Sequence, residues 1–221
     1  MTTDDMELVR QYAGDGSEEA FATLVSRYVN LVYSVALRQL GDAALAEEAT
    51  QATFIILARK AGSLGPKTIL SAWLCRTAQY VAARAIRTQS RRQNREQELY
   101  MQSLSNPPEP ETSPWPDIAP LLDSAMAGLG EKDHCAIVLR FFESKDLRHI
   151  GTALGVSENA AKKRVSRAVE KLRKFFVKRG ITLSATVIAG AISAHSVQAA
   201  PAALAKSVTS VAIAKGATAS A

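Results

Sequence analysis

The chain has 221 residues, a formal net charge of +6 and a pI near 9.4, which allows one or two small domains and favours a polyanionic partner. The charge is uneven: acidic side chains are concentrated in the first twenty residues, and basic ones in residues 84–95 and 162–179. The two cysteines do not predict a disulfide framework, and with 6% aromatic residues base stacking is limited to a few side chains.

Helical spacing dominates the N-terminal part, and nothing there is typical of a strand. We predict a first helical block over residues 8–12 and a long helix over 18–40. Gly41 then ends this helix, and Asp42 caps the next. The apolar face of the long helix consists of Phe21, Leu24, Val25, Tyr28, Val32, Ala36 and Leu40.

Two further helices are expected before residue 96. The helix over residues 43–60 should turn Leu45, Ala49, Ala52, Ile56 and Leu57 inward. Glu47, Glu48 and Gln51 then remain for a surface, which could be a simple solvated face. A third long helix begins near Ile69 and runs into a series of arginines: Arg84, Arg87, Arg91, Arg92 and Arg95.

Prolines interrupt the middle of the chain. Six of them lie between residues 106 and 120, and such a run is expected to be extended and non-helical. We therefore predict a linker followed by a second helical domain that begins near Ile118.

A helix-turn-helix pattern closes the second domain. Leu147, Ile150 and Leu154 give the first helix one apolar face, Gly155 supplies the turn, and Ser157 is a good N-cap for the second helix. The second helix has an apolar stripe of Ala161, Val165, Ala168, Leu172 and Phe176. Its opposite face carries Asn159, Lys163, Ser166, Arg167 and Lys174. A helix buried on one side and cationic on the other suits a DNA major groove, although a solvated helix of a bundle is the alternative.

Residues 181–221 are mostly Ala, Ser, Thr and Val, with Lys206 and Lys215 as the only Asp, Glu, Lys or Arg side chains. The apolar run over residues 181–194 is short for a membrane span and is diluted by polar residues. We expect a flexible or loosely docked extension, with a membrane-associated tail as the alternative.

The cysteines and histidines do not predict a metal centre or an enzyme. Cys75 and Cys135 lack partners at metal-binding spacing, and three scattered histidines form no ligand cluster: His134, His149 and His195. Although His134 adjoins Cys135, neighbours in a helix point about 100° apart, so adjacency does not make a catalytic dyad. We expect no catalytic residues, no metal and no cofactor. Because the chain opens acidic and without a signal peptide, we expect a cytoplasmic protein.

Taken together, the two halves resemble a bacterial sigma-70 family RNA polymerase sigma factor of the extracytoplasmic-function group. AFATLVSRYVNLVYSVALRQLGD (20–42), AEEATQATFIILAR (46–59) and WLCRTAQYVAARAIRTQSRR (73–92) are similar to sigma region 2, and LLDSAMAGLGEKDHCAIVLRFFE (121–143) with the helix-turn-helix is similar to region 4. The resemblance implies an all-α protein with region 2 over residues 7–95, a Pro-rich linker over 96–117, region 4 over 118–179 and an Ala-rich extension over 180–221.

For region 2, the resemblance implies two interfaces. The helix over residues 43–60 would bind the clamp helices of the largest subunit of core RNA polymerase through Glu47, Glu48, Gln51 and Phe54. The arginine-rich helix would meet the minus-ten promoter element through Gln79, Tyr80, Arg84, Arg87, Arg91 and Arg92. Many relatives carry Asn in place of Tyr80 and Asp in place of Arg84, so the base preference of this chain need not follow theirs.

For region 4, the resemblance implies recognition of the minus-thirty-five element and contact with the polymerase flap. The DNA-contacting residues would be Ser157, Glu158, Asn159, Lys162, Lys163, Arg164, Ser166, Arg167 and Lys171. An anti-sigma protein is the regulator that the resemblance suggests. The alternatives are a stand-alone helix-turn-helix regulator that binds an operator without polymerase, and a membrane-tethered interaction module that uses the tail.

Overall fold

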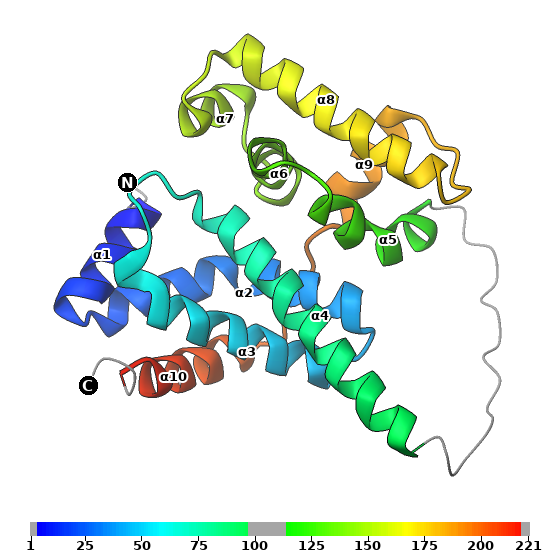
Figure 1. Cartoon of the computed structure of the whole chain (residues 1–221). Helices are drawn as coiled ribbons and strands as arrows, with labels where there is room; N and C mark the ends of the chain where they lie inside the picture. The colour runs from blue at the N-terminus through cyan, green and yellow to red at the C-terminus, as the bar shows by residue number, and fades with distance from the viewer. Residues whose placement is uncertain (1–3, 97–113, 218–221) are drawn as a thin grey trace.

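The computed structural model describes residues 4–96 and 114–217, and every regular element within these two ranges is helical (Figure 1). The all-α prediction is therefore confirmed for the described residues. In chain order the elements are α1 (Asp5–Asp15), α2 (Glu18–Leu40), α3 (Ala43–Lys60), η1 (Ala61–Ser63), α4 (Leu70–Glu96), α5 (Trp115–Ala127), α6 (Glu131–Ile137), η2 (Val138–Phe142), α7 (Leu147–Leu154), α8 (Glu158–Val177), α9 (Ala185–His195) and α10 (Leu204–Ala217).

The first four helices form an N-terminal bundle built around α2. Its predicted apolar face is buried except at Leu40, and Phe21, Leu24 and Val32 are among its fully enclosed side chains. Gly41 ends α2 in the left-handed conformation at φ 67°, and the Asp42 side chain accepts a hydrogen bond from the Leu45 amide at 2.8 Å. Both caps were predicted, so the ends of α2 and α3 lie where the sequence indicated.

The buried face of α3 differs from the prediction. Ile56 and Leu45 are only partly covered, whereas Thr50, Thr53 and Phe54 are fully buried. The two threonines can be buried because each hydroxyl donates to a backbone carbonyl one turn earlier, at 2.7 and 2.8 Å. Ala49 and Leu57 are buried as predicted, and Ala52 is partly covered. The prediction missed the two threonines because it counted only apolar residues.

The second domain begins with a helix where an extended linker was expected. Helix α5 starts at Trp115 and includes Pro116 and Pro120, so the prediction that residues 106–120 are non-helical is wrong from Trp115 onward. Pro116 lies in the first turn, where a backbone N–H would have no partner within the helix, so its absence costs no hydrogen bond. Pro120 lies inside the helix and removes one backbone hydrogen bond. The remainder of the expected linker lies outside the described residues.

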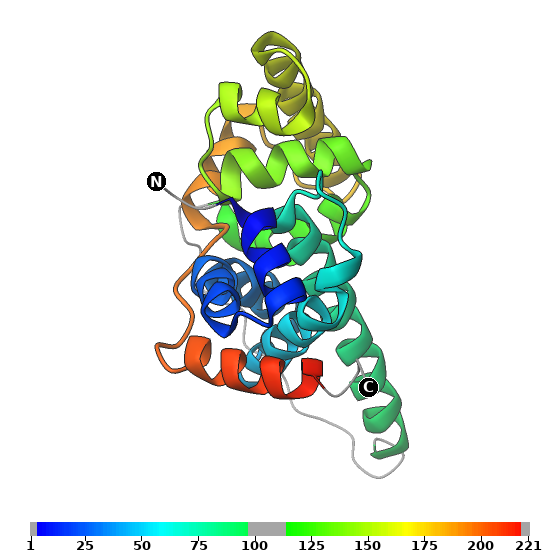
Figure 2. The ribbon, with the colours of Figure 1, turned by 90° about the vertical axis from the view of Figure 1, so that its left-hand side faces the viewer.

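The C-terminal segment, residues 181–217, is docked on the protein, and the expectation of a flexible or loosely docked extension is wrong. Ile188 and Ile192 of α9 are fully buried against the second domain, and Val208 and Ala212 of α10 are fully buried against the N-terminal bundle. Figure 2 shows the connection running from α9 in the upper half to α10 across the bottom of the bundle. Burial of these aliphatic side chains supplies the stabilisation that composition alone did not reveal.

Among the described residues, one helix is long and apolar enough to cross a membrane by length and composition. This helix is α2, and 67% of its apolar window is buried inside the protein. It is the central core helix of the N-terminal bundle, which accounts for its apolar composition.

Candidate nucleic-acid interface

Helices α7 and α8 form the predicted helix-turn-helix, and short backbone contacts fix its turn. Gly155 adopts the left-handed conformation at φ 65°, and the Val156 amide donates to the Gly151 carbonyl at 2.8 Å. A Cβ atom at Gly151 would lie 2.8 Å from the Val156 carbonyl oxygen, so the two segments approach too closely for any side chain there. The Ser157 hydroxyl accepts a hydrogen bond from the Ala160 amide at 3.3 Å and caps α8 as predicted.

The two faces of α8 separate as the sequence indicated. The whole predicted apolar stripe, from Ala161 to Phe176, is buried. The opposite face is exposed at Ser157, Glu158, Asn159, Lys162, Lys163, Ser166 and Arg167. This arrangement gives a rigid helix with an accessible polar and cationic surface along its first three turns.

Two cations of α8 form ion pairs with a side chain of another helix. Arg164 and Lys171 approach the two carboxylate oxygens of Asp133 in α6, at 3.0 and 2.6 Å. Burial acts to raise the pKa of Asp133, but the hydrogen bonds and charges of Lys171 and Arg164 prevail and hold that pKa below its ordinary value. These two side chains therefore fasten α8 to α6, and a phosphate would have to share them with Asp133.

The predicted DNA-contacting side chains of α4 fall into three groups. Tyr80 is 59% exposed, and Arg84 and Arg87 are also exposed. Gln79 is buried instead, and its amide donates to an Asp123 carboxylate oxygen in α5 at 3.2 Å. The backbone places Arg91 and Arg92 within α4, but their side chains lie outside the described residues.

The predicted polymerase-contacting residues of α3 are also divided. Glu48 is exposed, and Glu47 and Gln51 are half-buried. Phe54 is fully buried in the core of the bundle, so the aromatic contact expected at this position is not offered by the described surface.

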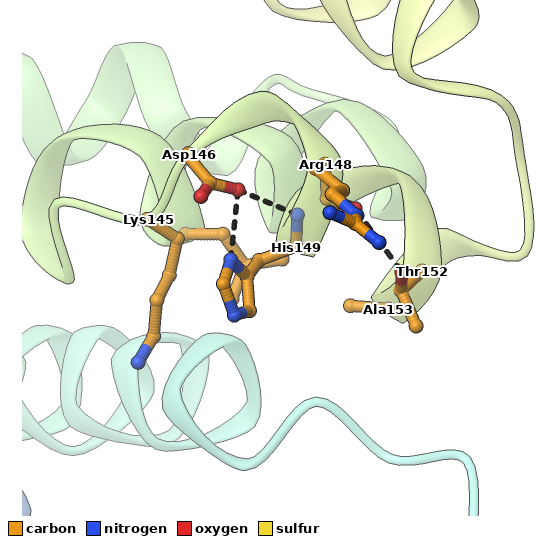
Figure 3. Close-up of a pocket in the computed structure, with 7 residues that line it drawn as sticks. Lys145, Asp146, Arg148, His149, Thr152 and Ala153 are labelled. Atoms are coloured by element: carbon orange, nitrogen blue, oxygen red, sulfur yellow. Dashed lines mark hydrogen bonds and ion pairs between the residues drawn. The ribbon is translucent and has the colours of Figure 1, made fainter.

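A hollow of about 660 Å³ beside the helix-turn-helix adds residues that the motif did not single out. Its polar lining comes from Lys145, Asp146, Arg148, His149 and Thr152. Figure 3 shows Asp146 bonded to both the backbone amide and the ring of His149, at 2.7 and 2.8 Å. In the sequence, only the position of Asp146 as the N-cap of α7 could have indicated this arrangement.

Comparisons with known proteins identify the family of this chain. Residues 24–92 match the family described as Sigma-70 region 2, and residues 125–174 match Sigma-70, region 4. RNA polymerase sigma factor CarQ of Myxococcus xanthus is 33% identical over 165 residues, which cover 72% of this chain and 91% of CarQ. The chain belongs to the sigma-70 family of RNA polymerase sigma factors. It is a sigma factor of the extracytoplasmic-function type, which directs transcription initiation by RNA polymerase.

Two further relatives are similar to this sigma factor. ECF RNA polymerase sigma factor SigW of Bacillus subtilis (strain 168) is 26% identical over 168 residues, covering 72% of this chain and 90% of SigW. The solved structure of the sigma factor RpoE in complex with the anti-sigma factor NepR from Bartonella quintana is 19% identical, covers 72% of this chain and 96% of that chain, and has a TM-score of 0.37.

The family assignment fixes what this sigma factor does at the level of the whole protein. Sigma factors bind core RNA polymerase and promoter DNA and are not themselves catalytic. Region 2 matches residues within α2–α4, and region 4 matches residues within α5–α8. The prediction of an extracytoplasmic-function sigma factor is therefore confirmed. Helices α9 and α10 lie beyond both matched segments.

Proposed function

We propose that α8 reads the minus-thirty-five promoter element with its N-terminal turns. Glu158, Asn159, Lys162 and Lys163 lie in the first two turns and are exposed, which is where base edges come within reach of a recognition helix. Phosphate contacts are assigned to the remaining polar residues of this surface: Ser157, Arg164, Ser166, Arg167 and Lys171. The observation that carries this proposal is the separation of the buried and cationic faces of α8.

The C-terminal half of α4 is the proposed contact with the minus-ten element. Tyr80 is the most exposed large hydrophobic side chain among the described residues of α4, and an exposed aromatic ring can stack on an unpaired base. Arg84 and Arg87 follow on the same helix and can hold phosphates, and Arg91 and Arg92 extend the series. Gln79 can join this contact only after it leaves Asp123.

The surface of α3 around Glu48 is the proposed contact with the clamp helices of core polymerase. Glu47, Glu48 and Gln51 offer carboxylate and amide oxygens to a basic partner. Region 4 is proposed to contact the polymerase flap, and an anti-sigma protein remains the proposed external regulator. We place this sigma factor in the cytoplasm, where its polymerase partner acts.

The proposal is tested by transcription in vitro from a promoter upstream of the protein's own gene, with core polymerase and the purified full-length chain. A start-specific transcript should require the chain. Lys163→Ala should lower promoter-specific initiation at least several-fold, because one base or phosphate contact of a recognition helix contributes about 1–3 kcal/mol. Lys132→Ala removes an exposed lysine of α6 and is the matched control. Equal transcription by the two variants would contradict the role of α8.

A further inference from the structure

The C-terminal segment contacts both DNA-contacting domains, beginning with region 4. Helix α9 buries Ile188 and Ile192 in contact with the second domain. Just after this helix, Ser196 is 1% exposed and its hydroxyl donates to the Phe141 carbonyl of η2 at 3.2 Å. The segment is thus fastened to region 4 before it turns toward the N-terminal bundle.

The connection between α9 and α10 is hydrogen-bonded along α2 of region 2. The Ser196 carbonyl accepts a hydrogen bond from Arg38. About one turn farther toward the N-terminus of α2, the Gln198 amide donates to the Ser34 hydroxyl at 2.8 Å. About one turn beyond that, the Ala200 amide donates to the Asn30 side chain at 2.9 Å. These three successive hydrogen bonds form a specific interface between the connecting segment and α2.

Arg38 also ties the two domains together directly. Its guanidinium pairs with the Asp123 carboxylate of α5 at 3.0 Å, and the two side chains are only 7% and 4% exposed. The same carboxylate accepts the Gln79 amide, which is the residue proposed to contact promoter DNA. In this arrangement, a region 2 side chain that is proposed to contact DNA is hydrogen-bonded to region 4.

Helix α10 then covers one side of α3. Val208 and Ala212 are fully buried, and a Cβ atom at Gly216 would lie 2.9 Å from the Cβ of Ala58. Arg59 donates to the Lys215 carbonyl at 3.2 and 3.3 Å, so the ends of the two helices lie together (Figure 1). Ala58 lies seven residues after Gln51, within about 20° of it around the helix. The contact with α10 therefore adjoins the proposed polymerase surface.

We propose that α10 and core RNA polymerase bind overlapping surfaces of region 2, so that the C-terminal segment is an internal competitor of the polymerase. This inference rests on the proposed role of α3. Docking of α10 holds the α3 surface partly covered, and the connection after α9 holds region 4 against region 2. Polymerase binding then requires α10 to leave α3. The apparent affinity for polymerase is therefore the intrinsic affinity multiplied by the fraction of molecules in which α10 is undocked.

The distance between the promoter elements is consistent with such an opening. Their names place them about 25 base pairs apart, or roughly 85 Å of duplex at about 3.4 Å per base pair. A compact chain of this length has a radius of gyration of about 17 Å and hence a diameter of roughly 45 Å. A closed molecule cannot reach both elements, so its two domains must separate on the promoter.

The test compares the affinity of core polymerase for the full-length wild type, Val208→Asp and Ser207→Asp. Val208 is fully buried in the α10 contact, and Ser207 is its exposed neighbour, so the two variants add the same charge at adjacent positions. Val208→Asp should bind core polymerase about tenfold more tightly than the wild type, because it frees α10. Ser207→Asp should bind like the wild type. Thermal unfolding of each variant checks that region 2 stays folded, and Gly216→Leu, which inserts a side chain against Ala58, provides a second way to displace α10.

The outcomes separate the inference from the proposed function. Equal binding by all the folded proteins would overturn the inference and leave the role of α3 in place. Weaker binding by both folded Val208→Asp and folded Gly216→Leu would also overturn it, since α10 would then help to form the polymerase surface. Normal binding by the wild type together with normal binding by Glu48→Lys would count against the role of α3 itself.

Discussion

At the residue scale, a few buried polar groups determine how the two halves of this sigma factor fit together. Arg38, Asp123 and Gln79 form one hydrogen-bonded group between α2, α4 and α5. Burying a charge pair contributes little net stability, but removing one partner leaves the other unpaired at a cost of about 3–5 kcal/mol. The group therefore fixes the mutual position of the domains more than it adds to their stability.

His134 supplies a pH dependence at the same scale. Its ring is fully buried, neither nitrogen has a hydrogen-bond partner in the described part of the chain, and burial, together with the charge of Arg76, lowers its pKa to about 4. Between about pH 6.5 and 4, the unfolded chain therefore binds a proton at His134 more readily than the folded chain does. The free energy of unfolding decreases as the pH falls through this range. Between pH 7 and 5, we expect the free energy of unfolding to fall by about 2 kcal/mol from this group alone.

Urea denaturation at both pH values measures this dependence. His134→Leu places an apolar side chain of similar size in the core and removes the titrating ring, so its unfolding free energy should change less between pH 7 and 5 than that of the wild type. The same loss in both proteins would contradict the assignment to His134.

At the scale of the elements, the sequence predicted the capped ends of helices and the faces of α2 and α8, but it missed part of the buried face of α3 and the start of α5. Caps such as Asp42 and Ser157 act through their own side chains and neighbouring amides, so they can be recognised locally. The burial of Thr53 and Phe54 depends on which helices surround α3, and this information is not local. For the candidate site, the opposite faces of α8 followed from helical spacing, whereas the burial of Gln79 and the pairing of Arg164 depend on residues 44 and 31 positions away.

Gly151 provides a test of the turn between α7 and α8. Helix propensity alone predicts that Gly151→Ala stabilises α7 by about 1 kcal/mol. The added Cβ would meet the Val156 carbonyl oxygen at 2.8 Å, and Val156 is held in place by its own hydrogen bond to Gly151. Because overpacking costs about 1–3 kcal/mol, we expect net destabilisation. Thermal unfolding of Gly151→Ala and of the exposed neighbour Thr152→Ala measures the effect. A Gly151→Ala variant more stable than the wild type would show that the turn can relax.

At the scale of the whole molecule, the order of the helices along the chain differs from their order in space. Helix α10 follows region 4 in sequence but packs on region 2 (Figure 1). The residues of α10 are small and weakly patterned, so the sequence predicted a loose tail. Neither the domain boundaries expected from the sequence nor the composition of residues 181–221 could indicate that α10 packs on α3.

Cleavage of the linker tests this arrangement. A protease site placed between residues 97 and 113 would separate the chain into one fragment with α1–α4 and another with α5–α10. We expect the fragments to remain together in gel filtration, because the second fragment still contributes α10 and the Asp123–Arg38 pair to the first. An uncut chain is the control. Elution of two separate folded fragments would show that the contacts between the domains depend on the linker.

The late position of α10 also has a consequence for synthesis on the ribosome. Helix α10 begins roughly a hundred residues after α4 ends, and translation at about 5–20 residues per second takes about 5–20 s to cover that distance. During this interval the nascent N-terminal bundle exposes the side of α3 that α10 later covers. Each newly made molecule thus passes through a brief uncovered period, in which a polymerase already present nearby would meet no internal competitor.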